Sequence, residues 1–194
     1  MTLSNLSNWL IAASWLVFIV YWAIMAVGVK RNIGRRRWGR EIGFRVAIVA
    51  LALLVLRVPA LRHALWQLHQ SMANPGMVLG LTGAALCVLG VGFAIWARVT
   101  LGRNWGMPMS RKEDPELVTG GPYAYVRHPI YTGILIAMLG SAMGGTVIWF
   151  IPLVLGAVYF VYSARNEEKL MLEQFPEQYP AYKRRTKMLL PFIV

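Results

Sequence analysis

The strongest constraint on the fold of this chain is an apolar stretch from Trp9 to Val29 that contains no charged residue. A helix needs roughly 20 mostly apolar residues to cross the hydrocarbon core of a bilayer, and this stretch is long enough. No basic residue precedes it and no small-residue cleavage pattern follows it, so we interpret it as a permanent span rather than a signal peptide. Hydrophobic residues make up 57% of the 194 residues. A soluble domain cannot bury so much apolar surface, so lipid is the predicted solvent for much of the chain.

Four further apolar runs predict an all-α polytopic membrane bundle of about five transmembrane helices. They cover Ile42–Pro59, Gly76–Val99, Ile130–Gly144 and Thr146–Ala164. In the third span Gly76, Gly80 and Ala84 share one face, which lets a neighbouring helix approach closely. Pro152 is expected to kink the fifth span. Beyond it, residues 166–187 predict an amphipathic helix, or two short ones broken near Pro176 and Pro180.

Basic residues predict the orientation of these spans. They gather in the first connection, the third connection and the tail, whereas the second and fourth connections hold few or none. By the positive-inside rule the amino terminus lies outside and the carboxyl terminus in the cytoplasm. The net charge of +12 does not indicate nucleic-acid binding, because the basic residues sit at the ends of apolar segments, where they contact anionic headgroups. The single cysteine, Cys87, excludes an intrachain disulfide.

The longest polar break in the second half of the chain reads LVTGGPYAYVRHPIYTG, from Leu117 to Gly133. The Gly-Gly-Pro step predicts a sharp turn that lets the backbone approach a ligand. Pro129 suits the first turn of the fourth span and leaves His128 at the mouth of that helix. Free N–H groups and the helix dipole favour an anion there. Arg127, His128 and Tyr131 are therefore predicted to help hold a carboxylate or a phosphate.

Glu167 and Glu168 follow the fifth span on the same predicted cytoplasmic side. At the start of a helix they could simply complement its dipole. In a cytoplasmic cavity, buried carboxylates would attract a cation. A ligand that carries both a carboxylate and a positive group would suit the two halves of this site.

The motif LVTGGPYAYVRHPIYTG, followed by EEKLMLEQFPEQYPAYKRR and LLPFI, resembles the isoprenylcysteine carboxyl methyltransferase family, whose wider relatives include phospholipid methyltransferases. The resemblance covers roughly Leu101 to the end. It implies a prokaryotic integral membrane enzyme that uses S-adenosylmethionine and methylates a lipophilic acceptor. Residues 1–100 would form a scaffold of three helices facing lipid and acceptor, and residues 101–194 the catalytic half, whose cytoplasmic-side cofactor pocket is closed by a C-terminal helix.

The resemblance also implies roles for individual residues. Glu167 would contact the amino or sulfonium end of the cofactor and, with Glu168 and Arg165, take part in catalysis. The implied cofactor-binding residues, besides Glu167, are Glu116, Leu117, Val118, Tyr123, Arg127, His128, Pro129, Ile130 and Tyr131.

One departure from the family pattern bears on the acceptor. Family members that methylate a prenylcysteine carboxylate carry an arginine four residues before the first glutamate, and here that position is Ser163. Arg165 lies about 200° away around an ideal helix. Either Arg165 takes the role after a local shift, or the acceptor is a different group, such as a lipid amine. A second departure is Pro115-Glu116, which replaces a histidine common there.

Two other functions remain open at this level. The first is an NADPH-dependent reductase of sterol-like or enone lipids, since sterol reductases share a similar C-terminal half; Arg103, Arg111 and Lys112 could then hold the 2′-phosphate. The second is a non-enzymatic membrane protein of the same fold. The sequence contains no G-x-G-x-x-G fingerprint and no metal-ligand cluster. We expect a multi-pass protein of the bacterial inner membrane whose site faces the cytoplasm.

Overall fold

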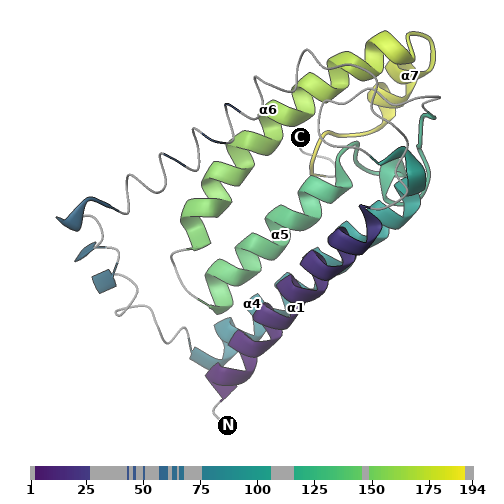
Figure 1. The fold of residues 1–194 in the computed structure, drawn as a ribbon. Helices are drawn as coiled ribbons and strands as arrows, with labels where there is room; N and C mark the ends of the chain where they lie inside the picture. The colour runs from purple at the N-terminus through teal and green to yellow at the C-terminus, as the bar shows by residue number, and fades with distance from the viewer. Residues whose placement is uncertain are drawn as a thin grey trace.

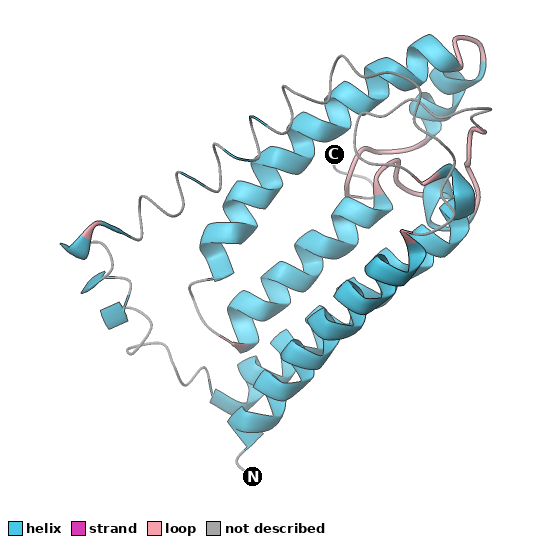
Figure 2. Ribbon diagram, viewed as in Figure 1, coloured by secondary structure: helices cyan, strands magenta, loops and turns pink. Residues whose placement is uncertain are grey.

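The computed structural model describes residues 3–26, 76–105, 116–145 and 149–190, together with a few isolated positions between 43 and 67. These segments are helical, apart from loops and one isolated bridge (Figure 1, Figure 2). The helices are α1 (Leu3–Met25), α4 (Gly76–Leu101), α5 (Pro129–Gly144), α6 (Phe150–Gln174) and α7 (Gln178–Arg185), with the short 3-10 helices η1 (Gly102–Asn104) and η2 (Gly121–Ala124). The predicted all-helical class is therefore confirmed.

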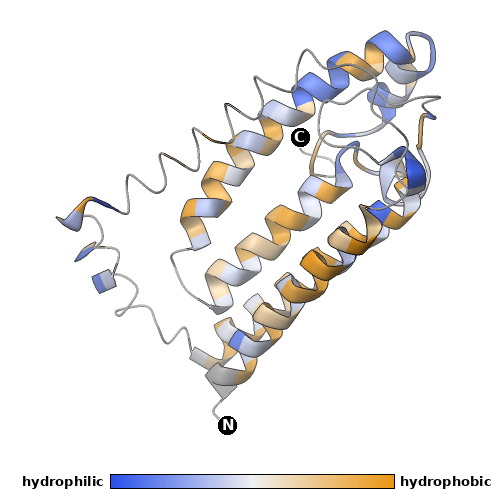
Figure 3. Ribbon diagram, in the orientation of Figure 1, coloured by the Kyte–Doolittle hydropathy of each residue, from blue (hydrophilic) through white to orange (hydrophobic). Residues whose placement is uncertain are grey.

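Two of these helices, α1 and α4, are long and apolar enough to cross a membrane, and α5 is a shorter apolar helix. The helices α4 and α5 match the predicted third and fourth spans within two residues. Large apolar side chains such as Leu16, Val78 and Leu89 are exposed along α1 and α4, and Figure 3 shows the apolar character of these helices. The second predicted span, Ile42–Pro59, lies almost entirely outside the described residues, so the number of spans stays a prediction.

The helices α4 and α5 pack at glycines that leave no room for a side chain. A Cβ added at Gly90 would lie 2.5 Å from the amide nitrogen of Ala137, and one added at Gly83 would lie 2.3 Å from that of Gly144. The predicted small-residue face is only partly right. Gly80 and Ala84 do lie against α5, since a Cβ added at Gly144 would lie 2.7 Å from the Gly80 carbonyl oxygen and 3.0 Å from the Ala84 amide nitrogen. A Cβ added at Gly76 would meet no atom within 4 Å, and Gly83 and Gly90, which also make the close approach, lie outside the predicted set.

Aromatic residues join α1 to the other helices. The indole Nε1 of Trp15 donates a hydrogen bond of 2.9 Å to Ser141 Oγ on α5. The Trp15 ring also stacks on Trp149, just before α6, with centroids 5.5 Å apart. Buried Cys87 and Ala137 belong to the apolar core between these helices. These contacts hold α1 against α5 and against the residue that precedes α6.

The structure corrects the predicted end of the fifth span. The helix α6 continues without a break from Phe150 to Gln174, so Glu167 and Glu168 lie inside it and do not begin a new helix. They therefore do not complement a helix N-terminus. Pro152 and Pro180 both fall in the first turn of a helix, where a missing N–H leaves no intrahelical bond unmade, so the expected kink and the break at Pro180 are wrong.

Candidate active site

A tight turn before α5 sets the start of the site. Gly121 has a φ of +58°, which glycine adopts without strain, and a Cβ there would lie 3.1 Å from the Thr100 side chain of α4. The turn continues as η2, in which Pro122 and Tyr123 are buried. The predicted Gly-Gly-Pro turn is thus confirmed, and it anchors the segment before His128 to the end of α4.

The residues after α7, Thr186–Leu190, run beside this turn, and we call them the C-terminal strap. The backbone N–H groups of Arg127 and His128 donate to the carbonyls of Lys187 and Met188 over 2.8 and 3.1 Å. One turn into α5, Thr132 Oγ1 donates to the carbonyl of Leu189 over 2.6 Å. The strap therefore fixes the backbone at His128, where α5 begins.

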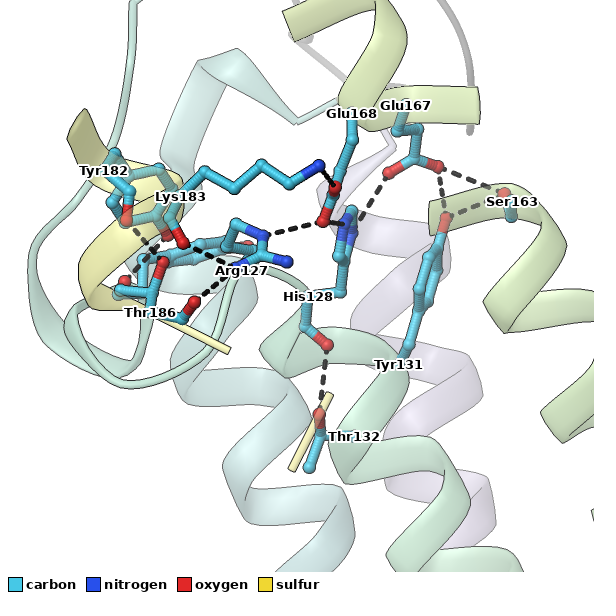
Figure 4. Close-up of polar contacts among 11 residues, drawn as sticks. Arg127, His128, Tyr131, Thr132, Ser163, Glu167, Glu168, Tyr182, Lys183 and Thr186 are labelled. Carbon is cyan, nitrogen blue, oxygen red and sulfur yellow. Dashed lines mark hydrogen bonds and ion pairs between the residues drawn. The ribbon is translucent and has the colours of Figure 1, made fainter. Parts of the chain in front are cut away.

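Three charged side chains, those of Arg127, Glu168 and Lys183, meet near the start of α5 (Figure 4). Glu168 Oε1 lies 2.6 Å from Arg127 Nε, and Glu168 Oε2 lies 2.6 Å from Lys183 Nζ. The Arg127 guanidinium also donates to the carbonyls of Lys183 and Thr186. Burial alone would raise the pKa of the Glu168 carboxyl, but the cationic groups of His128, Lys183 and Arg127 hold that pKa at about 2. Glu168 therefore joins α6, α7 and the His128 turn as a permanent carboxylate.

Glu167 has different neighbours. Its Oε1 accepts hydrogen bonds from the Tyr131 hydroxyl and, over 3.2 Å, from Ser163 Oγ. Its Oε2 lies 3.4 Å from His128 Nδ1. The side chain of Glu167 is 22% exposed, against 4% for that of Glu168. Two hydroxyls thus orient a carboxylate that is still open to a ligand.

The rings of His128, Tyr131 and Phe160 form a stack. The centroids of His128 and Tyr131 are 5.5 Å apart and nearly parallel, and those of Tyr131 and Phe160 are 4.6 Å apart. This stack holds the imidazole between the two glutamates. Its Nε2 is buried without a hydrogen-bond partner in the described chain, 3.8 Å from Glu168 Oε1. Burial alone would lower the pKa of His128, but Glu167 and Glu168 raise it above its ordinary value, which favours the imidazolium.

The structure brings most of the predicted site residues to one end of the bundle. The side chains of Arg127, His128, Tyr131, Glu167 and Glu168 meet there, with Pro129 buried and Ile130 half-buried beside them. Glu116, Leu117 and Val118 lie in a loop before the turn, and Asn104 Nδ2 donates to Glu116 Oε2 over 3.3 Å. Tyr123 is buried, and its carbonyl accepts a hydrogen bond from the Tyr182 hydroxyl. Arg165 lies exposed on α6, so its catalytic role stays a prediction.

Sequence reasoning missed five participants, one of which is Phe160, whose ring stacks on Tyr131. In the sequence, Ser163 stands out only because the family pattern has an arginine there. Its spacing of four residues from Glu167 puts both side chains on one face of a helix, and this spacing is the signal for their hydrogen bond. Lys183, Thr132 and the C-terminal strap gave no local signal, because their partners in the site lie far away in the sequence.

Comparisons with known proteins identify the family to which the chain is similar. The sequence profile of phospholipid methyltransferases (PEMT) matches residues 78–178. The nickel-cobalt-cadmium resistance protein NccN of Alcaligenes xylosoxydans xylosoxydans is 29% identical over 78% of this chain and 74% of its own length. The protein-S-isoprenylcysteine O-methyltransferase of Schizosaccharomyces pombe is 27% identical over 93% of this chain and 72% of its own length. That of Homo sapiens is 33% identical over 59% of this chain and 42% of its own length.

A solved structure has the same fold. The eukaryotic intramembrane Ras methyltransferase ICMT matches with a TM-score of 0.54 and 24% identity, over 83% of this chain and 55% of that chain. This chain thus spans about half the length of that protein, and less than half of the human relative. The profile match covers most of α4 and all of the His128 turn, α5 and α6. The chain therefore belongs to the phospholipid methyltransferase family, as a member similar to isoprenylcysteine carboxyl methyltransferases.

Proposed function

We propose that this chain is an S-adenosylmethionine-dependent membrane methyltransferase that methylates a lipophilic acceptor. Family membership and the apolar helices support a membrane methyltransferase. The observation that carries the proposal is the meeting of His128 and Glu167, from α5 and α6, with their side-chain atoms 3.4 Å apart at one end of an apolar bundle. That end is proposed to face the cytoplasm of a bacterium, at its inner membrane.

The side chains of the site fit this cofactor. S-adenosylmethionine supplies a methyl group activated on a sulfonium, and it also carries an ammonium and a carboxylate. The partly exposed Glu167 carboxylate would hold the ammonium or sulfonium end. His128, Pro129, Ile130 and Tyr131, at the N-terminal end of α5, would hold the negative end, since that end of a helix favours negative charge. Glu116, Leu117, Val118 and Tyr123 would line the remaining part.

The chain's own residues contribute binding and orientation more than acid–base chemistry. Methyl transfer to a free lone pair needs alignment and the exclusion of water. Tyr131 and Ser163 hold the Glu167 carboxylate in one orientation. Arg127 and Glu168, which contact each other and the surrounding backbone, act on the site by fixing the His128 turn.

The acceptor is proposed to enter from the bilayer, and its reacting group is a lipid amine or a prenylcysteine-like carboxylate. Ser163 occupies the position of the family's carboxylate-binding arginine, and it is fully buried and bonded to Glu167. Arg165 is exposed instead. A prenylcysteine carboxylate would thus need a rearrangement of Arg165, whereas an amine would not, so both classes belong in an acceptor screen.

Ligand-dependent thermal stability in mild detergent tests the cofactor. We expect S-adenosylmethionine and S-adenosylhomocysteine to raise the melting temperature, since a ligand at about 100 times its dissociation constant stabilises by roughly 2.7 kcal/mol. His128→Ala should abolish the shift. His63→Ala, a matched histidine change at an exposed position, should leave it intact.

The other outcomes favour different functions. A shift with NADPH alone would contradict the methyltransferase proposal and favour a reductase. No shift with any of the three compounds in a folded sample would favour a non-enzymatic membrane protein. A positive result would justify measuring transfer of a labelled methyl group to lipid amines and to prenylcysteine analogues.

A further inference from the structure

The end of α7 and the strap present four basic residues close together. Lys183, Arg184, Arg185 and Lys187 all lie on the surface, and we call them the basic face. Lys183 pairs with Glu168. Within the described residues no carboxylate pairs with Arg184, Arg185 or Lys187. Within the part of the chain that the structure describes, Arg184, Arg185 and Lys187 therefore carry positive charge that no ion pair compensates.

Hydrogen bonds place this basic face where α5 begins. Lys187 forms a parallel bridge with Val126, three residues before the first residue of α5. The strap then runs beside the first turn of α5, since Leu189 accepts the hydrogen bond from Thr132. The next residue, Leu190, is an exposed apolar side chain. Basic side chains followed by an exposed leucine, beside the end of an apolar helix, are typical of the boundary between lipid headgroups and acyl chains.

We propose that the basic face binds anionic phospholipid headgroups and that this contact holds the C-terminal strap against the His128 turn. Guanidinium groups form paired hydrogen bonds with phosphate oxygens, and the cytoplasmic surface of a membrane carries anionic lipid. The inference rests on the membrane location in the proposed function, but it does not require the chain to be a methyltransferase.

The same short segment connects the basic face to the site. Lys183 contributes its ammonium to Glu168 and its carbonyl to the Arg127 guanidinium. The strap carbonyls of Lys187 and Met188 accept the backbone N–H groups of Arg127 and His128. A headgroup bound at Arg184, Arg185 or Lys187 therefore restrains the segment that orders His128, and local opening of the strap becomes less frequent.

Lipid binding by the purified full-length chain tests the proposal. In neutral detergent the protein is titrated with short-chain phosphatidylglycerol, with phosphatidylcholine of the same chain length and with inorganic phosphate, and bound lipid is counted by native mass spectrometry. We expect phosphatidylglycerol to bind preferentially. Each of Arg184→Gln, Arg185→Gln and Lys187→Gln should weaken it about fivefold, which corresponds to about 1 kcal/mol per basic residue. Arg57→Gln changes an exposed arginine at the predicted outer end of the second span, outside the basic face, and should weaken binding less than any of these three changes.

Hydrogen exchange tests the coupling to the site. Phosphatidylglycerol should slow exchange of the Arg127 and His128 amides in the parent chain and in Arg57→Gln, and less so in Arg185→Gln. Equal binding of both lipids, equal weakening by Arg57→Gln, or the same protection by inorganic phosphate would overturn the proposal. No step measures methyl transfer or cofactor binding. These results can therefore be interpreted even if the proposed enzymatic function is wrong.

Discussion

At the scale of single residues, Glu167 and Glu168 have different tasks although they are neighbours on α6. Glu168 is nearly inaccessible and lies against two cationic side chains, Arg127 and Lys183. Glu167 is more exposed and is oriented by the hydroxyls of Tyr131 and Ser163. We therefore assign structural stability to Glu168 and ligand contact to Glu167, and each assignment can be tested by replacing the carboxylate with an amide of the same shape.

Glu168→Gln should destabilise the fold. The change leaves the buried Arg127 guanidinium without its carboxylate, and breaking a buried ion pair by removing one partner costs about 3–5 kcal/mol. The free energy of unfolding in detergent, measured by denaturant titration, checks this value. Lys169→Gln, a change at an exposed neighbour, is the control. A loss equal to that of the control would mean that the Arg127–Glu168 pair adds no stability.

Acid should weaken the fold through the same group. The pKa of Glu168 is lowered to about 2 in the folded chain, from an ordinary value of 4.5. A carboxyl whose folded pKa is depressed stabilises the fold fully above its unfolded pKa, and this stabilisation is lost as the pH falls toward the folded pKa. The parent chain should therefore lose more stability than Glu168→Gln between about pH 4.5 and 2. Melting temperatures of both proteins across that range test this, and parallel curves would contradict it.

Glu167→Gln should remove cofactor binding while the fold is kept. The amide retains the size of the side chain but lacks the negative charge proposed to face the ammonium or sulfonium. We expect an affinity for S-adenosylhomocysteine at least about tenfold weaker, equivalent to about 1.4 kcal/mol, at a nearly unchanged melting temperature of the ligand-free protein. Calorimetric titration measures the affinity. Unchanged binding would show that Glu167 does not contact the ligand.

The sequence was sufficient to predict which residues gather at the site, but not what each of them does there. The spacing of Arg127, His128 and Tyr131 around Pro129 indicated a helix start with ligand-binding groups. Which glutamate would be buried was not predictable, because Lys183 and Arg127 are distant in the sequence and reach Glu168 only through the fold.

At the scale of secondary-structure elements, the contact between α4 and α5 restricts most strongly which residues the sequence can hold there. Gly90→Ala should destabilise the bundle by about 1–3 kcal/mol, the usual effect of overpacking, because the added Cβ would lie 2.5 Å from backbone. Gly92→Ala is the matched control: it lies on the same helix and meets no atom within 4 Å. That change should be neutral or slightly stabilising, since alanine favours helix. Thermal unfolding distinguishes the two variants, and equal melting temperatures would show that the helices can separate at this contact.

The ends of a helix were predicted well where the amino-acid composition changes at the residue where the helix begins or ends. The start of α5 follows from Pro129, and both ends of α4 from its apolar run. The boundary expected near Asn166 was wrong, because a change from apolar to charged residues marks where a helix leaves its apolar surroundings and not where it ends. The helix α6 ends only at Gln174, two residues before Pro176.

At the scale of the whole molecule, the candidate site forms where two segments far apart in the sequence meet. The His128 turn precedes α5, and the strap that fixes it follows α7, some 60 residues later. Local sequence patterns predict each helix but not this pairing, because backbone hydrogen bonds of the strap leave no periodic signal. The same pairing brings the start of α5 together with the segment that follows α7.

The orientation of the chain in the membrane is a prediction that concerns the whole molecule. The start of α1 and the helix α7 lie at opposite ends of the bundle (Figure 1), and the basic residues predict that the α7 end faces the cytoplasm. Asn8→Cys and Gln178→Cys each place a thiol at an exposed position near one end, whereas native Cys87 is fully buried and should stay silent. An impermeant thiol reagent applied to intact bacterial spheroplasts should label Asn8→Cys alone, and both variants after permeabilisation. Labelling of Gln178→Cys alone in intact spheroplasts would reverse the topology and place the His128–Glu167 site outside, where a cytoplasmic methyl donor could not reach it.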